Sequence, residues 1–195
     1  RQHWFEEASL RNLFFAYLSS NNRLETELSA LRQTAPDENA WRSNPAAATF
    51  IASANLWQSH FEESAAPLKS LAEQYPAERQ IAETASSVYR SLAYFDTGAT
   101  AVAAKIQDNL LQANPRDTEI LARIGDIYSD REQFTQAARY WERIPRVSPG
   151  QQGGYLEAAT IYWDYFDFDN ALRLLNEGRG RLRQRLQRRR GIGPF

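Results

Sequence analysis

The chain has 195 residues, of which 43% are apolar and 12% aromatic, so it can fold around a substantial core. No stretch approaches the roughly 20 apolar residues that a membrane-spanning helix requires. The absence of cysteine excludes disulfides, thiolate metal sites and cysteine nucleophiles, but it leaves the compartment open. Because the chain begins at Arg1 and contains no methionine, we expect a fragment or a processed form, and both bacterial cytoplasm and periplasm remain open.

The net charge of −1 conceals two regions of opposite sign. Residues 1–178 hold all 24 acidic residues but only 16 of the 23 basic ones, which gives a net charge of −8. Residues 179–195 carry seven arginines and no acid. The sequence therefore places a dense cationic tail on an acidic body. Arginine outnumbers lysine 21 to 2, which favours a GC-rich bacterial source.

The first part of the chain reads as helical hairpins without a fixed period. Leucines and aromatic residues at helical spacing predict helices over 4–18 and 22–35. The polar run from Asp37 to Pro45 is expected to be a loop. A second hairpin is expected over 46–59 and 61–75.

From about residue 84 the sequence repeats every 34 residues. Tyrosine recurs at this interval three times, and alanine does the same; the positions are Tyr94, Tyr128 and Tyr162, and Ala103, Ala137 and Ala171. The clearest copy is 118–151, in which the small residues Gly125 and Ala137 allow two helices to approach each other. Tyr128 and Trp141 fill the space between them, and Pro149 ends the second helix.

This pattern resembles the tetratricopeptide repeat, a helical hairpin of 34 residues. The resemblance implies an all-α, right-handed α-α superhelix of about five helical hairpins, in which neighbouring copies bury each other's apolar faces. It implies one continuous solenoid in which residues 1–83 form diverged hairpins, 84–185 form three repeats and 186–195 form a basic tail. The repeats are 84–117, 118–151 and 152–185.

In proteins of this family the first helix of each repeat supplies a concave binding surface. The equivalent positions of the repeat in this sequence form a groove with acidic and apolar residues. They are Phe95, Asp96, Glu119, Asp126, Asp130, Leu156, Trp163 and Asp164. Such a groove would take a protein segment that carries Arg or Lys beside apolar side chains. The alternative is a solvated acidic face, with Trp163 and Phe95 packed between neighbouring repeats.

The arginine tail has three interpretations. It is the solvated C-terminal end of the last helix, a docking site for acidic partners, or a site for nucleic acid. The residues concerned include Arg179, Arg183, Arg188, Arg189 and Arg190. The sequence argues against nucleic acid, because no aromatic residue interleaves with these arginines.

Catalytic and metal-binding patterns are not found in the sequence. His3 and His60 lie in separate hairpins without a matching nucleophile. The run Asp164-x-x-Asp167-x-Asp169 lacks the glycine and the glutamate of a calcium loop. We expect no cofactor, no metal and no enzymatic activity.

The sequence predicts a protein-binding scaffold. The alternative is a structural or spacer region of a larger protein or assembly. Because repeat arrays normally close with polar capping helices, exposed ends of this one would favour self-association.

Overall fold

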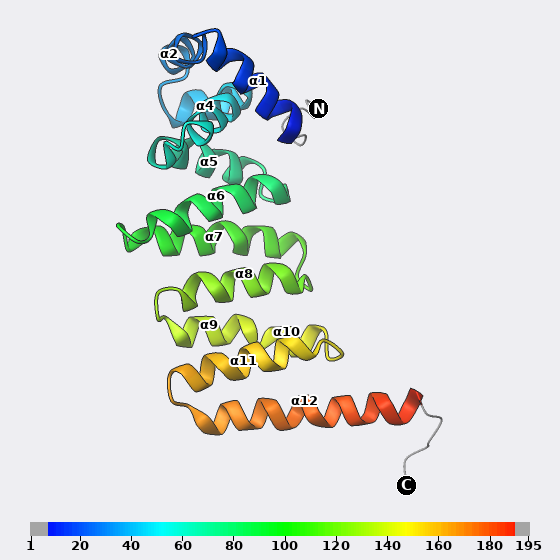
Figure 1. Ribbon diagram of the computed structural model, residues 1–195. Coiled ribbons are helices and arrows are strands. Elements are labelled where there is room, and N and C mark those ends of the chain that lie inside the picture. Colours follow the sequence, from blue (N-terminus) through cyan, green and yellow to red (C-terminus); the bar gives the residue numbers. More distant parts are fainter. Residues whose placement is uncertain (1–7, 190–195) are drawn as a thin grey trace. The chain divides into compact units, whose positions relative to one another are not determined.

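The computed structural model describes the backbone of residues 8–189 and the side chains of residues 12–187. Helices connected by short turns make up this part of the chain, and it contains no strand (Figure 1). Five helical hairpins are formed within it, so the predicted all-α repeat fold is confirmed. The chain divides into two compact units, Arg1–Leu110 and Leu111–Phe195.

The first unit contains three hairpins and one additional short helix. Its helices are α1 (Ala8–Ser20), α2 (Leu24–Thr34), α3 (Glu38–Ser43), α4 (Pro45–Trp57), α5 (Phe61–Gln74), α6 (Arg79–Leu92) and α7 (Gly98–Ala113), whose last three residues belong to the second unit. The apolar stripes of α1 and α2 meet α4 in one core cluster, which includes Phe15, Leu18, Leu28 and Ile51.

The expected loop from Asp37 to Pro45 is wrong, because most of it forms α3. Asp37 caps this helix by accepting the Ala40 N–H on Oδ1 at 3.0 Å. Asn44 caps α4 in the same way, with the Ala47 N–H 3.2 Å from its Oδ1. The polar residues that indicated a loop are thus caps of two successive helices. The Trp41 indole N–H, which donates to the Ala35 carbonyl at 2.8 Å, ties α3 to the end of α2.

The second unit consists of α8 (Thr118–Ser129), α9 (Phe134–Trp141), α10 (Arg143–Val147), α11 (Gln152–Asp164) and α12 (Phe168–Arg189). The expected second helix of the repeat 118–151 is divided into α9 and α10. Pro145 explains the division, because it has no N–H to donate to the Trp141 carbonyl and its ring crowds that group. The helical segment ends at Val147, two residues before Pro149.

Close approach of helices in this unit depends on glycine. A methyl group at Gly125 would lie 2.4 Å from the Trp141 indole ring, and one at Gly154 would lie 2.5 Å from Ile144. A methyl group at Gly178 would lie 3.0 Å from Tyr155. The predicted role of Gly125 in admitting the second helix is therefore confirmed.

Four of the turns inside hairpins share one geometry. Each contains a residue with positive φ, and these are Asn22 (54°), Ser59 (62°), Glu132 (55°) and Phe166 (67°). In each turn the N–H of the following residue donates back across the turn, for example from Arg23 to the Leu18 carbonyl and from Asp167 to the Tyr162 carbonyl, both at 2.9 Å. The same turn therefore occurs in the diverged hairpins and in the regular repeats, although the sequence spacing differs.

Candidate interaction surfaces

The apolar groove positions of the second unit lie on α11. Leu156 and Trp163 are seven residues apart, so they point to one side of the helix. Leu156 is 56% exposed and Trp163 is 63% exposed, which places both apolar side chains in contact with solvent. Asp164 is the last residue of α11 and is also exposed. The structure thus brings these three predicted residues onto one helix.

The acidic groove positions of the second unit lie on α8 and at its C-cap, Asp130. Glu119, Asp126 and Asp130 are spaced by seven and four residues, which places them on one face. Glu119 and Asp130 are exposed and Asp126 is half-buried. Arg123 belongs to the same face, four residues after Glu119 and three before Asp126. The face therefore combines three acids with one cation, so it is less acidic than the sequence selection alone indicated.

Phe95 and Asp96 belong to the first unit, at the turn between α6 and α7. Phe95 is 91% exposed. Asp96 accepts the Gly98 N–H on Oδ1 at 2.8 Å and so shapes the turn that precedes α7. Their participation in a surface with the residues of α8 and α11 stays a prediction.

An aromatic edge of three residues surrounds the turn between α11 and α12, and sequence reasoning missed its extent. We define it as Trp163, Phe166 and Phe168. The Trp163 and Phe168 rings are 4.8 Å apart in an edge arrangement, and the Phe166 and Phe168 rings are 6.2 Å apart. Phe166 is 80% exposed and holds a positive φ, a costly conformation for a bulky residue. Trp163 therefore contacts Phe168 but is not packed away between repeats.

Glu142, between α9 and α10, is the centre of a polar network. Its Oε1 accepts from the Tyr162 hydroxyl and from Arg173, both at 2.7 Å. Its Oε2 accepts from Arg146 at 2.8 Å. Burial raises the pKa of the Tyr162 hydroxyl, and the hydrogen bond to Glu142 raises it further. Because these contacts join residues that are up to 31 positions apart, no local pattern in the sequence could have identified them.

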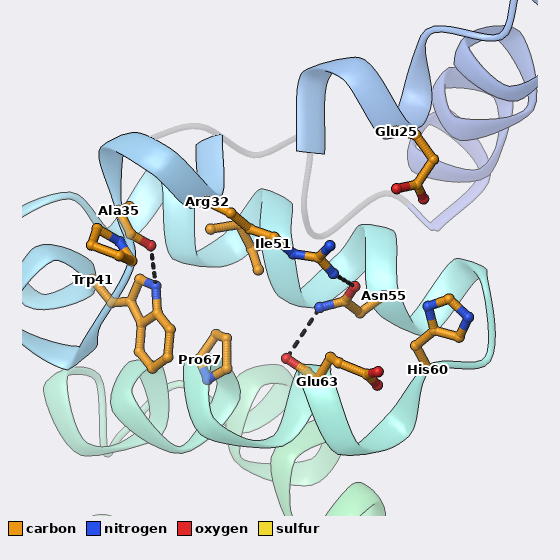
Figure 2. A pocket seen from close by; sticks show the side chains of 10 residues that line it. Glu25, Arg32, Ala35, Trp41, Ile51, Asn55, His60, Glu63 and Pro67 are labelled. Atoms are coloured by element: carbon orange, nitrogen blue, oxygen red, sulfur yellow. Dashed lines mark hydrogen bonds between the residues drawn. The ribbon is translucent and has the colours of Figure 1, made fainter. Parts of the chain in front are cut away.

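A cavity of about 440 Å³ lies in the first unit among α2, α4 and α5 (Figure 2). Asn55 is fully buried in its wall, where its Oδ1 accepts from Arg32 at 2.8 Å and its amide N–H donates to the Glu63 carbonyl at 3.1 Å. Glu25, also in the lining, accepts from Gln58. Asn55 and Glu25 are thus engaged in hydrogen bonds between segments of the first unit.

Four of the five predicted basic residues lie on α12. Arg179 and Arg183 are exposed, and Arg185 donates from Nη1 to the Gly150 carbonyl oxygen at 3.3 Å. Arg188 and Arg189 are the last two residues of α12, but their side chains lie outside the described residues. Arg190 lies outside them entirely.

In the acidic run at the turn before α12, Asp167 has a structural role. Asp167 accepts the Asn170 N–H at 3.1 Å and the Asn170 side-chain amide at 2.7 Å, and these hydrogen bonds lower the pKa of Asp167. No group of three or more potential metal ligands occurs among the residues that the structure describes. Within the same range, no helix is both long and apolar enough to cross a membrane.

Comparison with solved structures identifies the class of fold. MamA of strain AMB-1 superposes with a TM-score of 0.53 at 14% identity, over 88% of this chain and 92% of that one. MamA of strain MSR-1 gives 0.52 at 14%, over 90% and 98% of the two chains. A tetratricopeptide repeat protein from Parabacteroides merdae gives 0.53 at 20%, over 88% of this chain and 64% of that one.

No protein-family model matches the chain, and no curated protein sequence matches it. Identities this low establish the fold alone. The chain has a tetratricopeptide-repeat-like, all-helical fold. Folds of this class serve in general as scaffolds for protein interaction.

Proposed function

We propose that the protein is a non-catalytic scaffold that binds a partner segment through the second unit, on α8 and α11. The observation that carries the proposal is the exposure of Leu156 and Trp163 on one side of α11. Large aromatic side chains dominate the energetics of many protein interfaces, whereas a solvated helix face has no need of them.

The geometry favours an extended or helical segment that carries both basic and apolar side chains. Leu156 and Trp163 are separated by about 10 Å along α11, from the rise of a helix. Glu119, Asp126 and Asp130 outnumber Arg123 on the α8 face. Acidic side chains beside apolar anchors select Arg or Lys in the partner and increase the rate of association.

The experiment is a selection of random displayed peptides on the full chain, followed by affinity measurements on the tightest peptide. We expect selected peptides to combine Arg or Lys with apolar residues. Trp163→Ala should weaken binding at least about tenfold, as for an interface hot spot. Asp126→Asn with Asp130→Asn should weaken it by about three- to tenfold and reduce its salt dependence.

The matched control is Glu62→Gln with Glu78→Gln, which removes two charges from exposed positions of the first unit. This variant should bind the selected peptide with unchanged affinity. Selection of peptides without basic residues, or full affinity after Trp163→Ala, would contradict the groove. If no peptide is selected at all, a spacer region of a larger protein becomes the better interpretation.

A further inference from the structure

Helix α12 has a second apolar face, which is largely exposed among the residues that the structure describes; its first member, Phe168, contacts Trp163 and Phe166. The face toward α11 is buried through Ala171 and Leu174, and it continues at Gly178 against Tyr155. The other face carries large apolar residues that remain 36% to 59% exposed, namely Phe168, Leu172, Leu175, Leu182 and Leu186. We call these five residues the α12 seam.

The spacing of the seam is that of a coiled coil. Its members follow at intervals of four, three, seven and four residues. Arg179 lies four residues after Leu175 and three before Leu182, so it continues the alternation within the interval of seven. Alternating steps of four and three keep side chains on one stripe, as at the a and d positions of a heptad. The stripe extends about 27 Å along the helix, from Phe168 to Leu186. An exposed apolar stripe of this length is typical of a surface that binds another helix.

The charge around the seam specifies the chemistry of its occupant. Asp169 and Glu177 are the acidic residues of α12, and none follows Glu177 within the helix. Arg179 lies in the seam itself, and Arg183 follows Leu182 at an e position of the heptad. The C-terminal half of the seam is therefore apolar and strongly cationic, and an occupant of complementary charge carries Glu or Asp beside its apolar residues.

We propose that the α12 seam binds an acidic amphipathic helix of a partner, with Leu or a similar residue at its a and d positions and Glu or Asp at the flanking ones. A second copy of α12 complements the seam less well. In a parallel pair each Arg179 would face the other across the seam, and in an antiparallel pair centred on Glu177 it would lie opposite Leu175. The proposed surface on α8 and α11 selects a basic segment, so the two surfaces have opposite charge preferences.

The experiment titrates the full chain with three synthetic helical peptides of three heptads each. The first has Leu at a and d and Glu at e and g, the second has Lys in place of Glu, and the third has Glu but Ala in place of Leu. Like charges at e and g keep the peptides from pairing with themselves. We expect the acidic leucine peptide to bind at least about tenfold more tightly than either of the others, and its affinity to fall as salt is added.

Two variants of the chain test the site. Leu172→Gln, Leu175→Gln and Leu182→Gln together should weaken binding of the acidic peptide at least about tenfold, because the apolar contacts of the seam are lost. Glutamine has nearly the helix propensity of leucine, and these positions are exposed, so circular dichroism should show an unchanged fold. Arg179→Gln with Arg183→Gln should weaken binding about three- to tenfold and remove most of its salt dependence.

Asp126→Asn with Asp130→Asn is the control that separates the two surfaces, since it should leave binding of the acidic peptide unchanged. Failure of the seam proposal and failure of the groove proposal are thus distinguishable. Equal binding of the acidic and basic peptides, or full affinity in the triple leucine variant, would overturn the seam. So would a concentration-dependent dimer of the free chain that disappears in that variant, because a second copy would then be the occupant.

Discussion

The two units form the same kind of hairpin by different packing. In the first unit, α4 buries a row of alanines completely, and the buried Asn55 connects α2 and α5 through hydrogen bonds. In the second unit, glycines admit large side chains of the neighbouring helix, as Gly125 admits Trp141. The difference teaches that the fold needs close approach of helices rather than a particular residue. This is why the hairpins persist before residue 84 although the period of 34 residues is absent there.

The units also differ in where they place buried polar and exposed apolar side chains. The first unit buries the polar side chain of Asn55 and satisfies it with two hydrogen bonds, whereas the second unit gathers exposed apolar side chains on the two successive helices α11 and α12. Buried polar groups with partners stabilise a specific packing, and exposed apolar groups are available to a partner. The comparison is consistent with a packing role for Asn55 and with the proposed recognition roles of Trp163 and the α12 seam.

The largest expected effect tests close approach in the second unit. Gly125→Ala places a methyl group 2.4 Å from the buried Trp141 ring, so the ring or a helix must shift. We expect the free energy of unfolding to fall by about 3 kcal/mol, at the upper end of overpacking effects. Urea unfolding followed by circular dichroism measures the change.

Gly153→Ala is the matched control on α11, because a methyl group there would meet nothing within 4 Å. It should raise stability by up to about 1 kcal/mol through helix propensity. Equal effects of the two substitutions would show that helix propensity, and not contact with Trp141, determines the choice of glycine at position 125.

A smaller effect is expected at the polar centre of the first unit. Asn55→Ala leaves Arg32 and the Glu63 carbonyl without their partner and empties a buried site. We expect a loss of about 2 kcal/mol, within the range for buried groups left unsatisfied. The same urea titration reports it. The exposed polar variant Asn39→Ala, on α3, should change stability by less than about 0.5 kcal/mol.

The smallest expected effect concerns the Glu142 network and is visible mainly in its pH dependence. Tyr162→Phe removes the hydrogen bond to Glu142 and should cost about 1 kcal/mol at neutral pH. The folded pKa of Tyr162 is raised above the ordinary value of 10.0. Its contribution is therefore fully present below pH 10 and is lost as the pH rises toward the folded pKa.

Melting temperatures measured across the alkaline range should consequently fall less steeply in Tyr162→Phe than in the original chain. Tyr89 and Tyr165, whose pKa values are also raised chiefly by burial, supply the background decline in both proteins. Parallel curves for the two proteins would show that Tyr162 does not account for the alkaline loss.

Much of the fold could be predicted from the sequence. The repeated tyrosine and alanine positions indicated the hairpins from α6 onward, and the apolar stripes of 4–18 and 22–35 indicated the helices α1 and α2. The errors arose where one residue type serves two purposes. Asp37 and Asn44 read as loop residues but cap helices, and Pro145 divides a helix that Pro149 alone was expected to end.

The candidate surfaces were predicted less completely. Family offsets selected Leu156 and Trp163, which are exposed on α11, but they gave no reason to add Phe166 or to notice Arg123 within the acidic face. The α12 seam was missed because a leucine pattern alone does not tell which leucines face a neighbour. Leu174 is buried against α11, whereas Leu172 and Leu175, on either side of it, remain exposed.

The sequence by itself determined most of the helices, the period of the repeats and the sign of the charge in each part of the chain. These properties depend on side chains that are close together along the chain, so they can be read without a structure. Only the tertiary structure decided which apolar residues are buried and which polar residues pair, as Glu142 does with Tyr162 and Arg173. The physical reason is that burial and pairing depend on neighbours brought from distant positions, and in a repeat fold each helix has several faces that another helix can cover.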